Sequence, residues 1–137
     1  MSAGYSGTPL TKKIGVKPPA RALVVGAPPD APQLFDEGVQ VLLRAAEDLE
    51  AIVLFVTERR VLERKLPELR RRLADTGMLW VAWPKRASGV ATDVTEDTIR
   101  DLAVAETDLV DVKVIAIDET WSGLKLMVRR SARSSKR

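Results

Sequence analysis

The sequence predicts an α/β fold, a three-layer sandwich in which helices cover both faces of a mostly parallel β-sheet and an antiparallel hairpin closes its C-terminal end. Two observations lead to this prediction. Short runs of consecutive apolar residues, typical of buried strands, alternate with segments of helical periodicity. The last two apolar runs are joined by residues 118–123 alone, which is short enough for an antiparallel hairpin.

Six segments have the character of strands. Residues 51–56, AIVLFV, are the clearest, because unbroken apolar runs rich in β-branched residues are typical of strands buried on both faces. Residues 78–83, MLWVAW, form a second run of this kind. The remaining candidate strands are 21–26, 39–43, 112–117 and 124–128.

A long helix is expected between the strands 51–56 and 78–83. Thr57 is placed to cap it, Pro67 should kink or divide it, and Gly77 supplies its end. Its apolar stripe is formed by leucines at spacings of four, three and four: Leu62, Leu66, Leu69 and Leu73.

A second helix is expected after Thr95, with Ile99, Leu102 and Ala103 as its apolar positions. A short helix fits around 33–36, where prolines leave little room. The alternation of strands and helices therefore predicts a three-layer α/β sandwich of the Rossmann kind.

The two ends of the chain differ from its middle in composition. Residues 1–20 contain three glycines and three prolines, so we expect an arm with one helical turn at 9–14, capped by Thr8. Residues 129–137 hold five basic residues and no acid. The prediction is one Rossmann-like domain over 21–128, between the arm 1–20 and a basic, disordered tail at 129–137.

The net charge of +3 is unevenly distributed. Without the tail, 17 basic residues stand against 19 acidic ones, which gives residues 1–128 a net charge of −2. The tail could contact nucleic acid or another anionic surface, or it could be a solvated end. The acidic body argues against a broad nucleic-acid interface, so we rank that function last.

The chain has no cysteine and no histidine. This excludes disulfides, thiol nucleophiles, zinc sites built on Cys or His, Ser-His-Asp triads and imidazole bases, and no metal site is predicted. No apolar run reaches about 18 residues, and no apolar signal core follows Met1. We therefore expect a cytoplasmic protein that does not enter a membrane.

The order of the segments resembles a trimmed class I methyltransferase core. GVKPPARALVVGAPPD matches the first strand and its loop, and VKVIAIDETWSGLKLMV matches the closing hairpin. DLEAIVLFVTERRVLERKLPELRRRLADTGMLWVAWPK resembles the fourth strand, its helix and the fifth strand. The resemblance implies that a strand-helix unit is missing between 39–43 and 51–56.

The resemblance also implies S-adenosylmethionine as the cofactor, but two positions depart from the pattern that holds it. Gly26 is a lone glycine followed by Ala27-Pro28-Pro29, where several glycines are usual. Arg44 follows the second strand, where an acid usually binds the ribose. We therefore expect no cofactor and keep S-adenosylmethionine as the alternative.

Four motifs are similar to a small bacterial family known as domain of unknown function 3052. They are YSGTPLTKKIG, LFVTERRVLERKLPEL, LWVAWPKRASGVATDVTED and WSGLKLMV. The resemblance covers almost the whole chain. It implies the same fold and a cytoplasmic setting, and it implies no defined activity.

Ligands of parallel sheets bind outside the carboxyl ends of the strands. The turns at Gly26, Thr57 and Trp83 should therefore converge there. The loop after Trp83 adds Lys85 and Arg86, which can meet phosphate or carboxylate. The loop's polar residues could equally serve only a solvated connection and a helix cap.

Two further parts of the sequence complete the predicted site. Ser88 offers a hydroxyl in the loop that follows Trp83. Tyr5, Ser6 and Thr8 form a polar stretch of the arm that could fold over the sheet, swap onto a neighbouring subunit or stay disordered.

The sequence thus predicts a non-catalytic Rossmann-like domain that binds a small anionic ligand or a protein partner at the carboxyl end of its sheet. A methyltransferase-like enzyme with a degenerate cofactor loop is the alternative, and nucleic-acid association through the tail is the third. A homo-oligomer is compatible with each of them.

Overall fold

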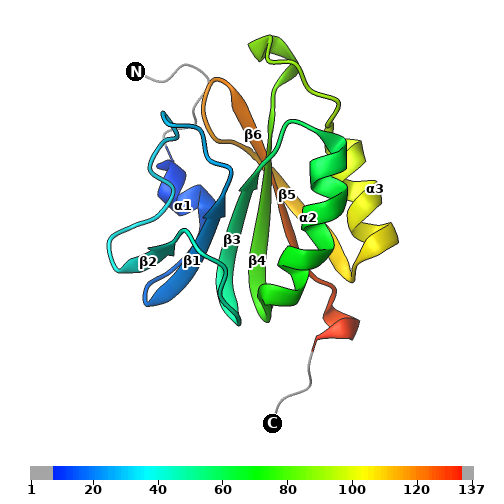
Figure 1. Cartoon of the computed structure of the whole chain (residues 1–137). Helices are drawn as coiled ribbons and strands as arrows, with labels where there is room; N and C mark the ends of the chain where they lie inside the picture. The colour runs from blue at the N-terminus through cyan, green and yellow to red at the C-terminus, as the bar shows by residue number, and fades with distance from the viewer. Residues whose placement is uncertain (1–7, 134–137) are drawn as a thin grey trace.

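A six-stranded sheet forms the centre of the protein, in the order β2-β1-β3-β4-β6-β5, in a computed structural model that describes residues 8–133 (Figure 1). Four strands run parallel: β1 (Ala20–Val25), β2 (Val39–Leu42), β3 (Leu49–Phe55) and β4 (Leu73–Pro84). β6 (Trp121–Val128) is antiparallel to both of its neighbours, β4 and β5 (Leu109–Ala116). The predicted parallel sheet with an antiparallel C-terminal hairpin is therefore confirmed.

Helices lie on both faces of the sheet. α2 (Arg59–Arg72) and α3 (Glu96–Glu106) cover one face, which we call the α2–α3 face (Figure 1). Leucines of the predicted stripe are buried there, against inward-facing side chains of β3, β4 and β6. α1 (Leu10–Ile14) and the loop 26–38 cover part of the other face, the α1 face, where Ile14, Leu34 and Phe35 pack around Trp80.

The long helix differs from its prediction in two ways. α2 continues through Pro67 as one helix, so the predicted alternative that Pro67 divides it is wrong, and Leu62, Leu66 and Leu69 are buried on both sides of the proline. It ends at Arg72, and the chain enters β4 directly at Leu73.

Gly77 does not end the helix but lies within β4. A Cβ atom at this position would lie 2.8 Å from the carbonyl oxygen of Leu49 and 2.8 Å from Cδ1 of Leu73. Glycine is therefore required because β3 approaches closely, at the point where the register between the two strands shifts.

Residues 27–38 contain no helix, so the expected short helix at 33–36 is wrong. Pro28, Pro29 and Pro32 leave no unbroken helical turn in this loop, and Leu34 and Phe35 are buried instead against the α1 face. The helical turn of the arm is present, but Pro9 occupies its N-cap position and Thr8 makes no cap.

A short crossing connects β2 to β3 over β1. In this segment the Arg21 guanidinium donates hydrogen bonds to the carbonyl oxygens of Glu47 and Asp48, at 2.6 and 3.0 Å. Arg72 of α2 also bonds the Glu47 carboxylate, at 2.5 Å. The segment 43–48, which contains no helix, thus makes the crossover from β2 to β3.

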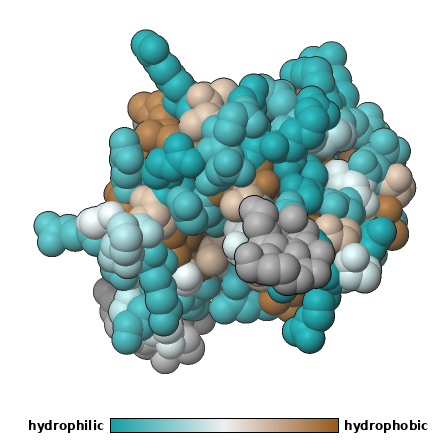
Figure 2. Space-filling model, turned by 90° about the horizontal axis from the view of Figure 1, so that it is seen from below, coloured by the Kyte–Doolittle hydropathy of each residue, from teal (hydrophilic) through white to brown (hydrophobic). Residues whose placement is uncertain are grey.

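The first part of the tail is folded. Residues 130–132 form a 3-10 turn, the Arg129 N–H donates to the Asp108 carbonyl, and the Arg133 guanidinium donates to the Val128 carbonyl. This differs from the disordered tail expected over 129–137, of which residues 134–137 lie outside the described range. Seen from this lower end of the sheet, the surface is mainly hydrophilic, with hydrophobic residues in separate small areas (Figure 2).

Candidate ligand-binding site at the carboxyl end of the sheet

Gly26, Thr57 and Trp83 lie at the same end of the sheet because β1, β3 and β4 are parallel neighbours. The chain after β1 lies close to the end of β3: a Cβ atom at Gly26 would lie 2.7 Å from the Phe55 carbonyl oxygen. The Val56 N–H donates to the Ala82 carbonyl at 2.9 Å, which continues the pairing past the end of β3. The structure thus places these three turns together.

The loop after β4 folds on itself first. Residues 86–88 form a 3-10 turn, and Gly89 follows in the left-handed region at φ 77°. The Ser88 hydroxyl donates to the Lys85 carbonyl at 2.6 Å and accepts from the Val90 N–H at 3.2 Å. Ser88 therefore stabilises the turn, and its hydroxyl is occupied by the loop itself.

The same loop is then fastened to the start of α2. The Thr92 hydroxyl donates to the Thr57 carbonyl at 2.6 Å, and the Asp93 carboxylate accepts a hydrogen bond from the Arg59 N–H at 2.7 Å. The prediction that Thr57 caps α2 is wrong, because Glu58 occupies the N-cap position. Asp93, which is distant in sequence, accepts a hydrogen bond from one of the free N–H groups of the first turn.

Thr95 caps α3, as predicted. Its hydroxyl accepts from the Thr98 N–H at 3.2 Å, and the Thr98 side chain accepts from the Thr95 N–H at 3.3 Å. Glu96 and Asp97 follow in the first turn, and both are bound by the guanidinium of Arg100. The hydrogen bonds that Arg100 donates to the Glu96 and Asp111 carboxylates raise the pKa of Arg100 above its ordinary value. The acids at this helix end are therefore partly neutralised.

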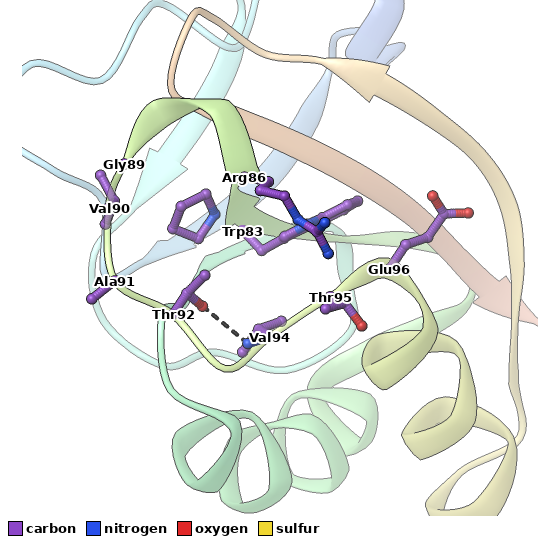
Figure 3. Close-up of a pocket in the computed structure, with 10 residues that line it drawn as sticks. Trp83, Arg86, Gly89, Val90, Ala91, Thr92, Val94, Thr95 and Glu96 are labelled. Carbon is purple, nitrogen blue, oxygen red and sulfur yellow. Dashed lines mark hydrogen bonds between the residues drawn. The ribbon is translucent and has the colours of Figure 1, made fainter.

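A cavity of about 580 Å³ opens between the loop, the end of β4 and the start of α3 (Figure 3). Its floor is apolar and includes Trp83, which is 8% exposed, and Val94, which is buried. Arg86 extends into the ring of lining residues (Figure 3). The lining is completed by small and polar residues: Pro84, Gly89, Val90, Ala91, Thr92, Thr95 and Glu96.

Arg86 and Glu96 are the charged residues of this lining, and they differ in their partners. Glu96 is paired with Arg100, whereas Arg86 makes no ion pair within residues 8–133. Arg86 is exposed and can turn its guanidinium toward a bound anion. The cavity therefore combines an apolar floor with one available positive charge.

Seven of the nine predicted site residues are described by the structure, and five of these seven do not line this cavity. Lys85 is half-buried, and its N–H donates to the Thr120 carbonyl at 2.7 Å. Gly26 and Thr57 lie farther along the same end of the sheet, and Ser88 serves the turn. Thr8 is exposed on the arm, and Tyr5 and Ser6 lie outside the described residues.

Sequence reasoning missed two kinds of site residue. Val90 and Val94 line the cavity, and their signal was the presence of two isolated valines in a polar loop. Asp93 shapes the site by holding the loop on α2, and nothing local in the sequence indicates its partner. Within the described part of the chain, no group of three or more acidic side chains could hold a metal ion.

The residues after β1 and β2 do not match the requirements of S-adenosylmethionine. The single Gly26 is needed for the approach to Phe55, and Leu43 and Arg44 follow β2 in place of a ribose-binding acid. A second cavity of about 290 Å³ beside them is lined mainly by apolar residues, among them Val24, Leu34, Phe35 and Val41. These two positions therefore depart from the pattern that the methyltransferase resemblance implies for holding this cofactor.

Comparisons with known proteins identify the fold. No protein-family model and no curated sequence matches the chain. Among solved structures, the chain is similar to a SAM-dependent methyltransferase from Aquifex aeolicus, with 14% identity and a TM-score of 0.56, covering 85% of this chain and 86% of that one. It also resembles a ribosomal protein L11 methylase from Lactobacillus delbrueckii subsp. bulgaricus, with 12% identity, a TM-score of 0.56, and coverage of 88% and 75%.

A third similar structure is a protein of the NADB-Rossmann superfamily from Streptococcus agalactiae, with 14% identity and a TM-score of 0.54. The match covers 100% of this chain and 73% of that one. Within the described residues, no helix has the length and hydropathy needed to span a membrane. The similarity establishes the fold: the chain is a Rossmann-like, methyltransferase-like α/β protein with an antiparallel hairpin at its C-terminal end.

Proposed function

We propose that this protein is a binding module for a small amphipathic anion, with an apolar or aromatic body and a phosphate or carboxylate group, held in the cavity between Trp83 and Glu96. The observation that supports this most directly is the unpaired guanidinium of Arg86 beside an apolar floor. Sites for small ligands are commonly apolar clefts with a few polar groups that fix orientation.

The composition of the cavity supports binding without catalysis. Among the described lining residues, Arg86 and Glu96 carry the titratable groups, and Arg100 already engages the Glu96 carboxylate. Ser88 and Thr92 direct their hydroxyls to backbone carbonyls. A general base needs an acceptor within reach of the substrate, and Glu96, the one carboxylate among the described lining residues, already has one oxygen bonded to Arg100.

The first experiment is a thermal-shift screen of the full chain with nucleotides and phosphorylated metabolites, followed by calorimetry on any compound that stabilises it. A ligand at 100 times its Kd should stabilise the folded chain by about 2.7 kcal/mol. Arg86→Ala should weaken binding at least tenfold, since a hydrogen bond to a charged group contributes about 1.5–3 kcal/mol.

Arg71→Ala is the matched control, because Arg71 is exposed on α2 and makes no ion pair in the described structure. It should leave the affinity unchanged. The proposal fails if no compound stabilises the protein, or if Arg86→Ala binds as tightly as the unaltered chain.

An S-adenosylmethionine-dependent methyltransferase is the second candidate, favoured by the fold that the chain shares with a SAM-dependent methyltransferase. The residues after β1 and β2 argue against it, so we rank it lower. Calorimetry with S-adenosylmethionine decides between the two. A saturable heat would favour the enzyme, and no heat at about 1 mM, where binding free energy is only about −4 kcal/mol, would remove it.

The same proposal includes a cytoplasmic setting and membership of the family known as domain of unknown function 3052, on the four motifs given above. Nucleic-acid association through the tail stays a prediction. If it occurs, affinity should fall steeply with salt and disappear when the chain is cut after Val128.

A further inference from the structure

The two outer edges of the sheet are built differently. β5 carries Asp111 and Lys113 in its middle, and its register with β6 shifts between these residues. Charged side chains and bulges on an edge strand keep further strands from pairing with it. The β5 edge is therefore protected.

β2 has no such protection. Its register with β1 is regular, and residues 39–43 read Val-Gln-Val-Leu-Leu, without charge or proline. Val41 is 48% exposed and Leu43 82% exposed. An edge strand with unpaired backbone groups and exposed apolar side chains favours pairing with another strand.

Apolar surface continues from this edge onto the α1 face. Val39 packs against the buried residues of that face, and side chains alternate along a strand, so Val41 points to the same side. Val41 and Leu43 line the second cavity together with Leu34 and Phe35. A strand added at β2 would cover these side chains as well as the free backbone groups.

Charged residues flank the apolar strand with opposite signs at its two ends. Asp36 and Glu37 precede it, and Arg44 follows it. All three are exposed, and none forms an ion pair within residues 8–133. An antiparallel copy of the same segment would bring each acidic end to a basic end, whereas a parallel copy would bring like charges together.

We infer that β2 is the interface for a second copy of this chain, paired antiparallel about a two-fold axis at Val41. In this register Val41 lies opposite Val41 of the second copy, and Val39 lies opposite Leu43. Arg44 of each copy comes opposite Gly38 of the other, beside Glu37. The interface is isologous, with one patch contacting itself, as in most dimers.

This inference is independent of the proposed ligand cavity, which lies at β4 and is separated from β2 by β1 and β3. Sedimentation velocity of the full chain over a concentration series tests it. The mass should rise from that of the monomer, 15.1 kDa, to twice that value. Val41→Lys places a charge at the centre of the interface and should keep the chain monomeric.

Val114→Lys is the matched control on β5, where Val114 is 44% exposed. It should dimerise like the unaltered chain. Far-UV circular dichroism and thermal unfolding of both variants establish that the fold is retained. The inference is overturned if the unaltered chain stays monomeric, if Val41→Lys still dimerises, or if the β5 variant is the one that dissociates.

A pair of charge reversals tests the register. Arg44→Glu and Glu37→Arg each place like charges at both ends of the interface, so each variant alone should lose the dimer. Mixing the two variants restores opposite charges at both ends, and a heterodimer should form. Failure of the mixture to associate would refute the antiparallel register. A dimer of either variant alone would also refute it, because association by apolar contact alone would not depend on the signs of these charges.

Discussion

The Asp93 carboxylate accepts a hydrogen bond of 2.7 Å from the backbone N–H of Arg59, a residue 34 positions earlier in the chain. The bond joins the loop that forms the cavity to the first turn of α2. A single side chain thus both satisfies a helix end and fixes the shape of the proposed site.

Removing this carboxylate should destabilise the protein. Asp93→Ala is expected to lower the free energy of unfolding by about 1 kcal/mol, the usual effect of losing a helix cap. Asp93→Asn should lose much less, since its carbonyl oxygen can accept the same bond. Urea unfolding of the three proteins measures the difference, and equal losses for both variants would show that the hydrogen bond is not the cause.

Substitutions at Gly26 and Gly89 separate two causes of lost stability: an unfavourable backbone conformation and a steric clash of the added Cβ atom. Both glycines are left-handed, at φ 74° and 77°, but a Cβ at Gly26 would lie 2.7 Å from the Phe55 carbonyl oxygen, whereas nothing lies within 4 Å at Gly89. Gly89→Ala should therefore cost about 1 kcal/mol. Gly26→Ala should cost about 3 kcal/mol, because a backbone clash adds to the conformational strain. Chemical unfolding measures both losses of stability, and a larger loss for Gly89→Ala than for Gly26→Ala would contradict this explanation.

Asp108 should make the stability depend on acid pH. Two hydrogen bonds from the Arg70 guanidinium, at 2.5 and 3.1 Å, lower the pKa of Asp108 below its ordinary value against an opposing effect of burial. The folded chain therefore binds this proton less readily than the unfolded chain. The stabilisation is complete above the pKa of an unfolded aspartate, about 3.9, and is lost as the pH falls through the lower pKa of the folded state.

Asp108→Asn should remove this pH-dependent stabilisation. At pH 7 the loss is expected to be about 2 kcal/mol, because a charged hydrogen bond in a partly buried position is weakened. At about pH 2 the difference from the unaltered chain should become small. Asp101→Asn, on the exposed surface of α3, should change stability little at either pH.

Lys125 should be a position where removing a charge stabilises the fold. It lies opposite Lys113 in the β5–β6 pair, and burial, followed by the charge of Lys113, lowers the pKa of Lys125. The charged form is thus disfavoured in the folded state at neutral pH. Stability should rise as the pH increases through this lowered pKa toward that of an unfolded lysine.

Lys125→Met should accordingly raise the midpoint of urea unfolding at pH 7, and its advantage should shrink near pH 10, where an unfolded lysine also loses its charge. Lys17→Met, at an exposed position, is the control and should shift the midpoint little. A destabilised Lys125→Met protein at pH 7 would contradict the argument.

Strands and helices with a clear apolar pattern could be predicted from the sequence. β3 and β4 each contain an unbroken apolar run, at 51–55 and 78–84, and the leucine stripe of α2 has a helical period, so the sequence predicted their type and order correctly. The boundary between α2 and β4 was missed because Leu73 continues the helical spacing while already pairing with Leu49 of β3. A pattern of apolar residues does not distinguish these two states over a few positions.

The detail of the site could be predicted only in part. The convergence of Gly26, Thr57 and Trp83 follows from strand direction, which the fold class determines. The hydrogen-bond partners of the Ser88 and Thr92 hydroxyls could not be predicted in this way, because both hydroxyls donate to backbone carbonyls whose positions depend on the tertiary fold. A polar loop in the sequence thus looks richer in free ligand-binding groups than the folded loop is.

The bulge and charges of β5 have a consequence for the size of any assembly. A pair of chains joined through β2 would expose a β5 strand at each end of one continuous twelve-stranded sheet. Because neither end accepts a further strand, growth would stop at two copies, and fibril formation through this sheet would be blocked.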